Sequence, residues 1–356
     1  MIEKFQVDSL KKFAAQVFEK AGIPPEDAFR IAHVLVTTDM RGVHSHGVVR
    51  SARYIDCIQA GGIKSAAEPV ILEESASHLR VSAAGGLGIP ASVKTTEKLI
   101  EKAKNTPIAV ATVNHSDHYG AAGYYAMLCA EAGLIGFSMS NTVPLVAVTG
   151  GASAGIGNNP FAYACPAGKF RAILFDVCMS VVASGKIEIA SREHKKIPFG
   201  WILDKDGNPT DDPDQIYKGA VMLPFGGHKG YGIAAMVEMM TSLLGNAGLL
   251  SGVKSWNMVP GRDSNTGHCF MAVNPRFFGG LDSFVARTEQ MIEEIKAGKK
   301  TAGTEKIFYP GEIEFAKEAD ALANGVPLSD ASINELKRAA SLVGTDVSGL
   351  EKCRIG

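Results

Sequence analysis

Apolar residues recur with helical spacing near both ends of the chain. Leu10, Phe13 and Val17 lie three to four residues apart, which predicts an amphipathic helix capped by Asp8 or Ser9. The same spacing predicts helices over 25–36, 50–60, 283–297, 312–324 and 329–343. Both ends of the chain are therefore expected to be mainly helical.

Between these ends, short continuous apolar runs alternate with helical segments. Runs of this length are typical of buried strands. Strands are predicted over 69–74, 78–84, 108–114, 134–141, 171–180 and 269–275, and helices over 90–104, 120–133 and 231–245. Two stretches rich in glycine and proline, 142–169 and 195–230, predict long connections that carry function or cover an interface. This order of elements predicts an α/β core between helical ends.

The composition is that of an ordinary globular protein, with 356 residues, 46% hydrophobic and 21% charged, and a net charge of −1. Nucleic acid requires a basic surface, and the sequence has no basic block. It has no signal-peptide pattern and no run of 18 apolar residues. Six scattered cysteines without a CxxC pair predict reduced thiols rather than metal ligands. These features favour a cytoplasmic protein without metal, nucleic-acid or membrane partners.

A first candidate site is the segment 39–50, which crowds His44, Ser45, His46 and two arginines onto a short turn. Histidine titrates near neutral pH, so it can exchange a proton as a carbonyl becomes an alcohol. The planar fork of an arginine binds a carboxylate through two hydrogen bonds. A 2-oxo acid needs one group of each kind. The competing interpretation is a polar helix end whose side chains only cap the turn.

A second candidate is the segment 113–123, which follows an apolar strand and opens a helix of small residues. Ligands of α/β folds bind at strand ends. His118 stands just before this helix, where the helix dipole disfavours imidazolium and favours a neutral base. The alternative is a histidine that only fixes the turn by hydrogen bonds.

The third candidate is the glycine-rich segment 226–232, which leads into a helix whose N-terminus suits an anion. Lys229 could meet a phosphate or the ribose of a cofactor there, although a flexible loop with a surface lysine is the alternative. A Rossmann fingerprint is missing, because Pro160 ends its nearest approach, 155–160, in place of glycine. That absence bears on the fold and not on the chemistry.

These segments together resemble the malate/L-lactate dehydrogenase family that lacks a Rossmann fold. Its members include ureidoglycolate dehydrogenase, sulfolactate dehydrogenase, diketogulonate reductase and the Δ1-piperideine-2-carboxylate reductases. The similarity runs over nearly the whole chain and is carried by 41–50, 114–126, 157–166, 184–190, 197–213, 224–232 and 309–315. Ser184 and Asn158 depart from the family pattern, where arginine and threonine are common.

The resemblance implies an α/β fold with two domains. A small helical domain is built from both chain ends, 1–70 and 305–356. A larger non-Rossmann α/β domain, 71–304, binds NADH or NADPH. The resemblance also implies a homodimer with its active site near the subunit boundary.

It further implies the roles of individual residues. His46 and Ser45 belong to the Ser-His-Gly triplet at the active site, His118 is a general acid/base, and Arg50 holds the substrate carboxylate. The implied cofactor contacts are Asp176, Val177, Cys178, Ser180, His228, Lys229, Gly230, Gly311 and Glu312.

The predicted reaction is hydride transfer between NAD(P)H and C2 of a small 2-oxo or 2-hydroxy acid of the malate, lactate, ureidoglycolate or sulfolactate type. A reductase of cyclic imino acids is the alternative, because the same arginine and histidine can serve a C=N bond. A binding protein without turnover is a third possibility. The presence of His46, His118 and Lys229 together argues against it.

Overall fold

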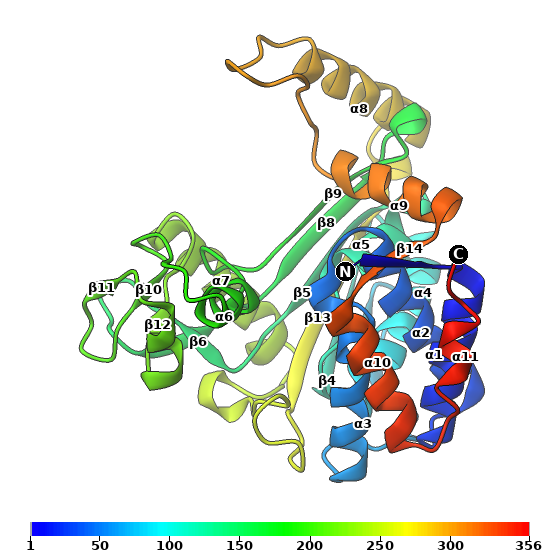
Figure 1. Ribbon diagram of the computed structural model, residues 1–356. Helices are drawn as coiled ribbons and strands as arrows, with labels where there is room; N and C mark the ends of the chain where they lie inside the picture. Colours follow the sequence, from blue (N-terminus) through cyan, green and yellow to red (C-terminus); the bar gives the residue numbers. More distant parts are fainter. Residues whose placement is uncertain (1, 356) are drawn as a thin grey trace.

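A seven-stranded sheet forms the centre of the molecule in this computed structural model, which describes residues 2–355 (Figure 1). Its order is β2-β3-β4-β13-β5-β8-β9. The strands are β2 (Val70–Glu74), β3 (His78–Ser82), β4 (Ile108–Ser116), β13 (Thr266–Val273), β5 (Ile135–Ser140), β8 (Phe161–Pro166) and β9 (Ala172–Val177). All neighbours pair antiparallel except β3 and β4, which run parallel.

The central strand β13 is covered on both faces, which explains its continuous apolar sequence. Successive side chains of a strand point to opposite faces. Phe270 belongs to the main core, whereas Cys269 packs with Val237 and Met139 in a separate cluster. The helices α4 (Gly88–Ala103) and α5 (Ala122–Glu131) pack on the sheet, and α2 (Pro25–Met40) packs on α4.

The two chain ends lie together beside this sheet. The strand β1 (Ile2–Phe5) pairs antiparallel with β14 (Val326–Ser329), and α10 (Asp330–Leu342) packs on α3 (Ser51–Gln59). The remaining helices of this region are α1 (Val7–Lys20), α9 (Glu312–Asn324) and α11 (Ser348–Glu351). Figure 1 shows the blue and red segments side by side.

A second sheet of five strands, in the order β11-β10-β12-β6-β7, lies to one side of the centre (Figure 1). It consists of β6 (Pro144–Ala147), β7 (Ala154–Gly157), β10 (Ile202–Leu203), β11 (Pro209–Thr210) and β12 (Val221–Met222). The helices α6 (Ser184–Arg192) and α7 (His228–Glu238) accompany it, and α7 continues as a π-helical turn, Met239–Leu243. Its own apolar core includes Val146, Ile187 and Ile202.

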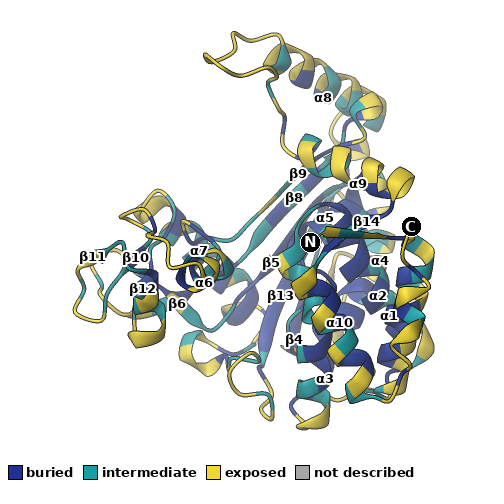
Figure 2. Cartoon of the chain, viewed as in Figure 1, coloured by how far each residue is buried: buried dark blue, intermediate teal, exposed yellow. Residues whose placement is uncertain are grey.

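The helix α8 (Leu281–Lys296) forms an arm that extends away from the body (Figure 1). Only Thr288 and Ile292 of this helix are buried. Figure 2 accordingly shows the arm as mostly exposed, in contrast to the dark blue centre.

The helices and central strands predicted from periodicity are confirmed, with shifts at their ends. The predicted long connections were wrong, because 142–169 contains β6, β7 and β8, and 195–230 contains β10, β11 and β12. These strands are mostly very short and interrupted by glycine and proline, so they lack a readable period. The predicted cap of the first helix was also wrong: α1 begins at Val7 after Gln6, without a side-chain cap.

An ionic cluster around the buried Glu318 ties the C-terminal region to the centre. Glu318 on α9 accepts hydrogen bonds from Arg41, directly after α2, at 2.9 Å and from Arg171, directly before β9, at 3.2 Å. Burial alone would raise the pKa of Glu318, but the two guanidinium groups lower it below its ordinary value. One carboxylate therefore joins three segments that are distant in the sequence.

We predict that Glu318→Ala lowers the free energy of unfolding by about 3–5 kcal/mol, because it leaves the buried Arg41 without its partner, whereas the exposed Arg171 keeps Glu131. Chemical denaturation at neutral pH measures this change. The control Glu101→Ala removes an exposed pair with Lys104 and should cost less than about 1 kcal/mol. Equal effects of the two substitutions would contradict a structural role for the ionic cluster.

Candidate active site

The candidate catalytic residues meet where three segments come together: α3 with the turn before it, the turn after β4, and the loop 253–265. Figure 1 shows α3 beside the end of β4 and the yellow-green loop. The structure brings the candidate residues Ser45, His46 and Arg50 together with His118. It adds two aromatic residues, Tyr54 and Trp256.

His118 stands at the centre of this cluster. Its ring stacks on Trp256 with centroids 4.6 Å apart and on His46 at 5.5 Å. The Tyr54 hydroxyl lies 2.5 Å from Nδ1 of His118. No hydrogen bond of Nε2 is seen among residues 2–355. The ring is thus held on several sides while one nitrogen stays available to a ligand.

Buried polar groups fix the turn that carries His118. Asp117 accepts a hydrogen bond from the backbone N–H of His118 at 2.6 Å and another from the hydroxyl of Ser264 at 2.6 Å. Next to it, Tyr119 stacks on the fully buried His268 at 4.3 Å. Burial raises the pKa of Asp117 to about 6. The turn is therefore a rigid place for a catalytic histidine.

The turn with Ser45, His46 and Arg50 consists of two 3-10 turns, His44–His46 and Val48–Arg50. The Ser45 hydroxyl lies 2.8 Å from Nδ1 of His46. Nε of Arg50 donates to the carbonyl oxygen of Ser45 at 2.6 Å, and its guanidinium lies over Trp256 at 5.8 Å. No partner of the terminal nitrogens of Arg50 is seen within the described chain. They are free to bind a carboxylate.

Asp39 at the end of α2 anchors this turn. The buried carboxylate accepts from the backbone N–H of Val48 at 2.8 Å and lies 2.9 Å from Nδ1 of His44. A Cβ atom at Gly47 would lie 2.2 Å from this carboxylate. Glycine at this position is therefore required by space.

Both histidines are neutral at physiological pH. Burial and the neighbouring His46 and Arg50 lower the pKa of His118 well below its usual value. Burial and Arg50 lower the pKa of His46 to about 4, although its ring keeps some contact with solvent. A neutral imidazole can accept or donate a hydrogen bond, depending on which nitrogen carries the proton.

Trp256 was missed by sequence reasoning, because it lies in an irregular loop without a motif. Arg53 on α3 holds the loop by donating to the carbonyl oxygen of Trp256 at 2.9 Å and to that of Asn257. Cys57 donates to the same Trp256 oxygen at 3.4 Å. Tyr54 was missed as well, since its position on α3 fits an ordinary core residue. It is fully buried.

Four of the predicted cofactor residues, Asp176, Val177, Cys178 and Ser180, lie at the end of β9 or directly after it. Asp176 accepts from the backbone N–H of Gly123 in the first turn of α5 at 2.7 Å, which links this strand to the turn of His118. Desolvation by the neighbouring protein raises the pKa of Asp176 to about 6, although the residue as a whole is exposed. Val177 pairs with Phe161 of β8. The Cys178 thiol lies 3.3 Å from the buried hydroxyl of Ser180.

The loop 224–230 adjoins this segment. Ser180 forms a bridge with Pro224, and Phe225 N–H donates to Met179 at 3.0 Å. His228 and Lys229 are exposed at the N-terminus of α7. A Cβ at Gly230 would lie 2.3 Å from the carbonyl oxygen of Phe225. The structure therefore brings Ser180 and the lysine loop together.

Gly311 lies at the other end of β9, where its φ of +97° and its contact with Leu174 require glycine. Glu312 is already paired, because its carboxylate accepts from Lys296 at 2.7 Å and lies 2.7 Å from Nζ of Lys306. Burial alone would raise the pKa of Glu312, but these two lysines lower it below its ordinary value.

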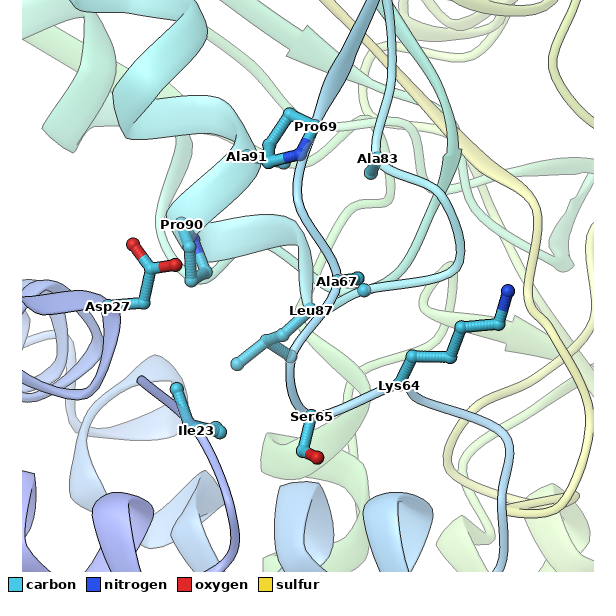
Figure 3. A pocket seen from close by; sticks show the side chains of 11 residues that line it. Ile23, Asp27, Lys64, Ser65, Ala67, Pro69, Ala83, Leu87, Pro90 and Ala91 are labelled. Carbon is cyan, nitrogen blue, oxygen red and sulfur yellow. The ribbon is translucent and has the colours of Figure 1, made fainter. Parts of the chain in front are cut away.

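A small pocket lies between the start of α2, the segment 63–69 and the start of α4 (Figure 3). The Asp27 carboxylate that faces it accepts from Lys94 at 2.8 Å and from Arg30 at 3.0 Å. No histidine lines this pocket. The acid is paired, so the pocket does not compete with the histidine cluster as a catalytic site.

Within residues 2–355, no three or more histidine, cysteine, aspartate or glutamate side chains lie together so that they could hold a metal ion. In the same described range, no helix is both long and apolar enough to cross a membrane.

Comparison with known proteins gives a consistent result. A family model for malate/L-lactate dehydrogenase matches residues 5–337. A malate dehydrogenase from Pyrococcus abyssi is 39% identical over 351 residues, covering 97% of this chain and 95% of that protein. A Δ1-pyrroline-2-carboxylate/Δ1-piperideine-2-carboxylate reductase from Pseudomonas putida is 32% identical over 329 residues, covering 92% and 94%. The structure of a sulfolactate dehydrogenase from Methanocaldococcus jannaschii matches with a TM-score of 0.90 at 34% identity, covering 99% and 100%.

These similarities define the class of protein as a dehydrogenase with a mixed α/β fold. The chain belongs to the malate/L-lactate dehydrogenase family. The resemblance inferred from the sequence motifs is confirmed.

We predict that Gly47→Ala displaces the Ser-His-Gly turn, because its Cβ overlaps the Asp39 carboxylate. Overpacking of this kind costs about 1–3 kcal/mol. Thermal unfolding should show a lower Tm, and substrate turnover should fall. The control Gly252→Ala places its Cβ where no atom lies within 4 Å and should change neither. A Gly47→Ala protein with unchanged activity and Tm would contradict the tight fit.

Proposed function

We propose that this protein transfers a hydride between NAD(P)H and C2 of a small 2-oxo or 2-hydroxy carboxylic acid. The observation that carries the proposal is that the free terminal nitrogens of Arg50 and the neutral imidazole of His118 lie in one cluster around Trp256. One group suits a carboxylate and the other suits the adjacent carbonyl or hydroxyl oxygen. Malate and sulfolactate, named for the relatives above, are both 2-hydroxy carboxylates.

Arg50 binds the substrate carboxylate through its terminal nitrogens. His118 meets the C2 oxygen through Nε2, while His46 and Ser45 lie beside it and orient or polarise the substrate. Burial keeps both histidines neutral, so the hydrogen bond to the C2 oxygen is made by an uncharged imidazole. The stacked Trp256 excludes water from one side of His118.

The non-Rossmann α/β region provides residues that fit a dinucleotide. The strand β9 and Ser180 lead to the N-terminus of α7, where Lys229 is exposed and Gly230 lets the backbone fold tightly. Backbone N–H groups at such a helix end bind phosphate, and a lysine adds charge. When bound, the nicotinamide supplies or accepts the hydride. His228, Gly311 and Glu312 complete the proposed cofactor region, with Glu312 acting through Lys296 and Lys306 rather than as a free acid.

We further propose a cytoplasmic homodimer. Exposed apolar side chains gather on and beside the α8 arm, which the rest of the described chain does not cover. They are Phe277, Phe278, Met291, Ile295 and Phe308. Apolar surface of this kind marks protein interfaces. The division into a helical domain, 1–70 with 305–356, and a cofactor-binding domain, 71–304, stays a prediction.

A substrate panel tests the proposed function. Absorbance of NADH and of NADPH is followed with pyruvate, oxaloacetate, sulfopyruvate and Δ1-piperideine-2-carboxylate. Turnover of a 2-oxo acid supports the proposal, and the more active cofactor answers the choice between NAD and NADP. Turnover of the cyclic imine alone would replace the proposal by an imino acid reductase.

We predict that Arg50→Met raises KM for the 2-oxo acid and lowers kcat/KM about a hundredfold, since a charged, desolvated hydrogen-bonded pair is lost. Binding of NADH, followed by fluorescence, should stay near normal. The control Arg338→Met removes an arginine that pairs with Asp56 at the surface. An Arg50→Met enzyme with unchanged kcat/KM removes this assignment.

We predict that His118→Ala lowers kcat by about a hundred- to ten-thousandfold, because it removes the ring that passes a proton to the C2 oxygen and takes up a replacement proton from solvent. His46→Ala should cost less and appear mainly in KM, since its role is to orient. Both are measured over a range of pH with saturating NADH. If His118→Ala keeps the wild-type kcat and pH profile, the proton role passes to His46.

A further inference from the structure

The environment of Nδ1 of His118 shows which ring nitrogen carries the proton. The backbone N–H of Gly120 points at this atom from 3.4 Å, and a backbone N–H can only donate. The Tyr54 hydroxyl lies 2.5 Å from the same atom. A long bond to an N–H and a short bond to a hydroxyl thus converge on one nitrogen, which favours Nδ1 as an acceptor.

The Tyr54 hydroxyl supports the same assignment. Tyr54 is fully buried, and no other hydrogen-bond partner of its hydroxyl is seen within residues 2–355. If the hydroxyl accepted a proton from Nδ1, its own hydrogen would be left unpaired in the protein interior, which costs free energy. Donation from Tyr54 to Nδ1 satisfies both groups. Burial also raises the pKa of Tyr54, so its proton is retained.

We propose that Tyr54 is a positioning residue that holds His118 in the tautomer with the proton on Nε2. Nε2 is the nitrogen without a partner among the described residues, so its N–H is the group presented to the ligand. A neutral ring of this form donates a hydrogen bond, which matches the carbonyl oxygen of a 2-oxo acid. A 2-hydroxy acid must lose its hydroxyl proton to an acceptor nitrogen. The resting site is therefore set for the 2-oxo acid.

The stacking around His118 keeps its ring in one orientation. Trp256 and His46 both stack on the ring with interplanar angles of 28° and 27°. A flip of the ring would break the Tyr54 contact and bring a carbon atom to the hydroxyl. The hydrogen bond at Nδ1 and the stacked rings thus fix the direction of Nε2–H. The tautomer follows from these contacts alone, whereas its match to a 2-oxo acid rests on the proposed function.

Imidazole 15N NMR of the whole protein near neutral pH tests the tautomer without any need for turnover. His118 is assigned by the signals that disappear in His118→Asn. In the wild-type protein we expect a pyridine-like Nδ1 and a pyrrole-like Nε2. In Tyr54→Phe the Nδ1–H form should gain population, because the stronger donor is gone. A pyrrole-like Nδ1 in the wild-type protein would overturn the proposal, and this spectrum needs no variant to fold.

A matched control removes a different buried hydroxyl. Tyr309 is buried and donates to the carbonyl oxygen of Phe170 at 2.9 Å, with no hydrogen bond to His118 or to its turn. Tyr309→Phe should leave the His118 signals at their wild-type positions. The same displacement of these signals in both variants would show a general structural effect and overturn the assigned role of Tyr54.

Binding of oxamate, an unreactive 2-oxo acid analogue, with NADH or NADPH present tests the link to the substrate. Tyr54→Phe should bind it roughly tenfold more weakly than the wild type, the effect of one lost hydrogen bond. Unchanged affinity would overturn the link between tautomer and 2-oxo acid. If wild-type NMR shows Nε2–H but the protein neither binds oxamate nor reduces any 2-oxo acid, the proposed function fails while the tautomer stands.

Discussion

The contact of the buried Glu318 and Arg41 with Arg171 is the constraint on which the site depends. Arg41 stands three residues before the turn that begins at His44, Arg171 directly before β9, and Glu318 lies on a helix from the C-terminal end. A buried charge is tolerated only when it is paired. These three groups therefore fix the Ser-His-Gly turn and the start of the proposed cofactor strand in one arrangement.

Carboxylates also fix the backbone around the site, where three aspartates accept hydrogen bonds from backbone N–H groups. Asp39 holds the N–H of Val48, Asp117 that of His118, and Asp176 that of Gly123. A carboxylate that accepts from the main chain fixes the path of a turn and leaves the neighbouring side chains free. Side chains of the site can then stay unpaired in a rigid setting, as the terminal nitrogens of Arg50 do among the described residues.

The chemistry of the cluster follows from what surrounds each ring. Burial makes His46 and His118 neutral, so the two rings differ in their geometry rather than in their charge. Tyr54 and Trp256 supply that geometry by a hydrogen bond and a stack.

The sequence by itself determined the family, the helical ends and the central strands, because the period of apolar residues is a local property. It also determined Ser45, His46, Arg50 and His118 as candidates, because they stand in dense motifs. Only the tertiary structure decided that Tyr54 and Trp256 join them, since each looks like an ordinary core or loop residue until α3 and the loop 253–265 meet. The five-stranded sheet was likewise invisible, because strands of two to four residues gain their stability from pairing across the chain rather than from their own pattern.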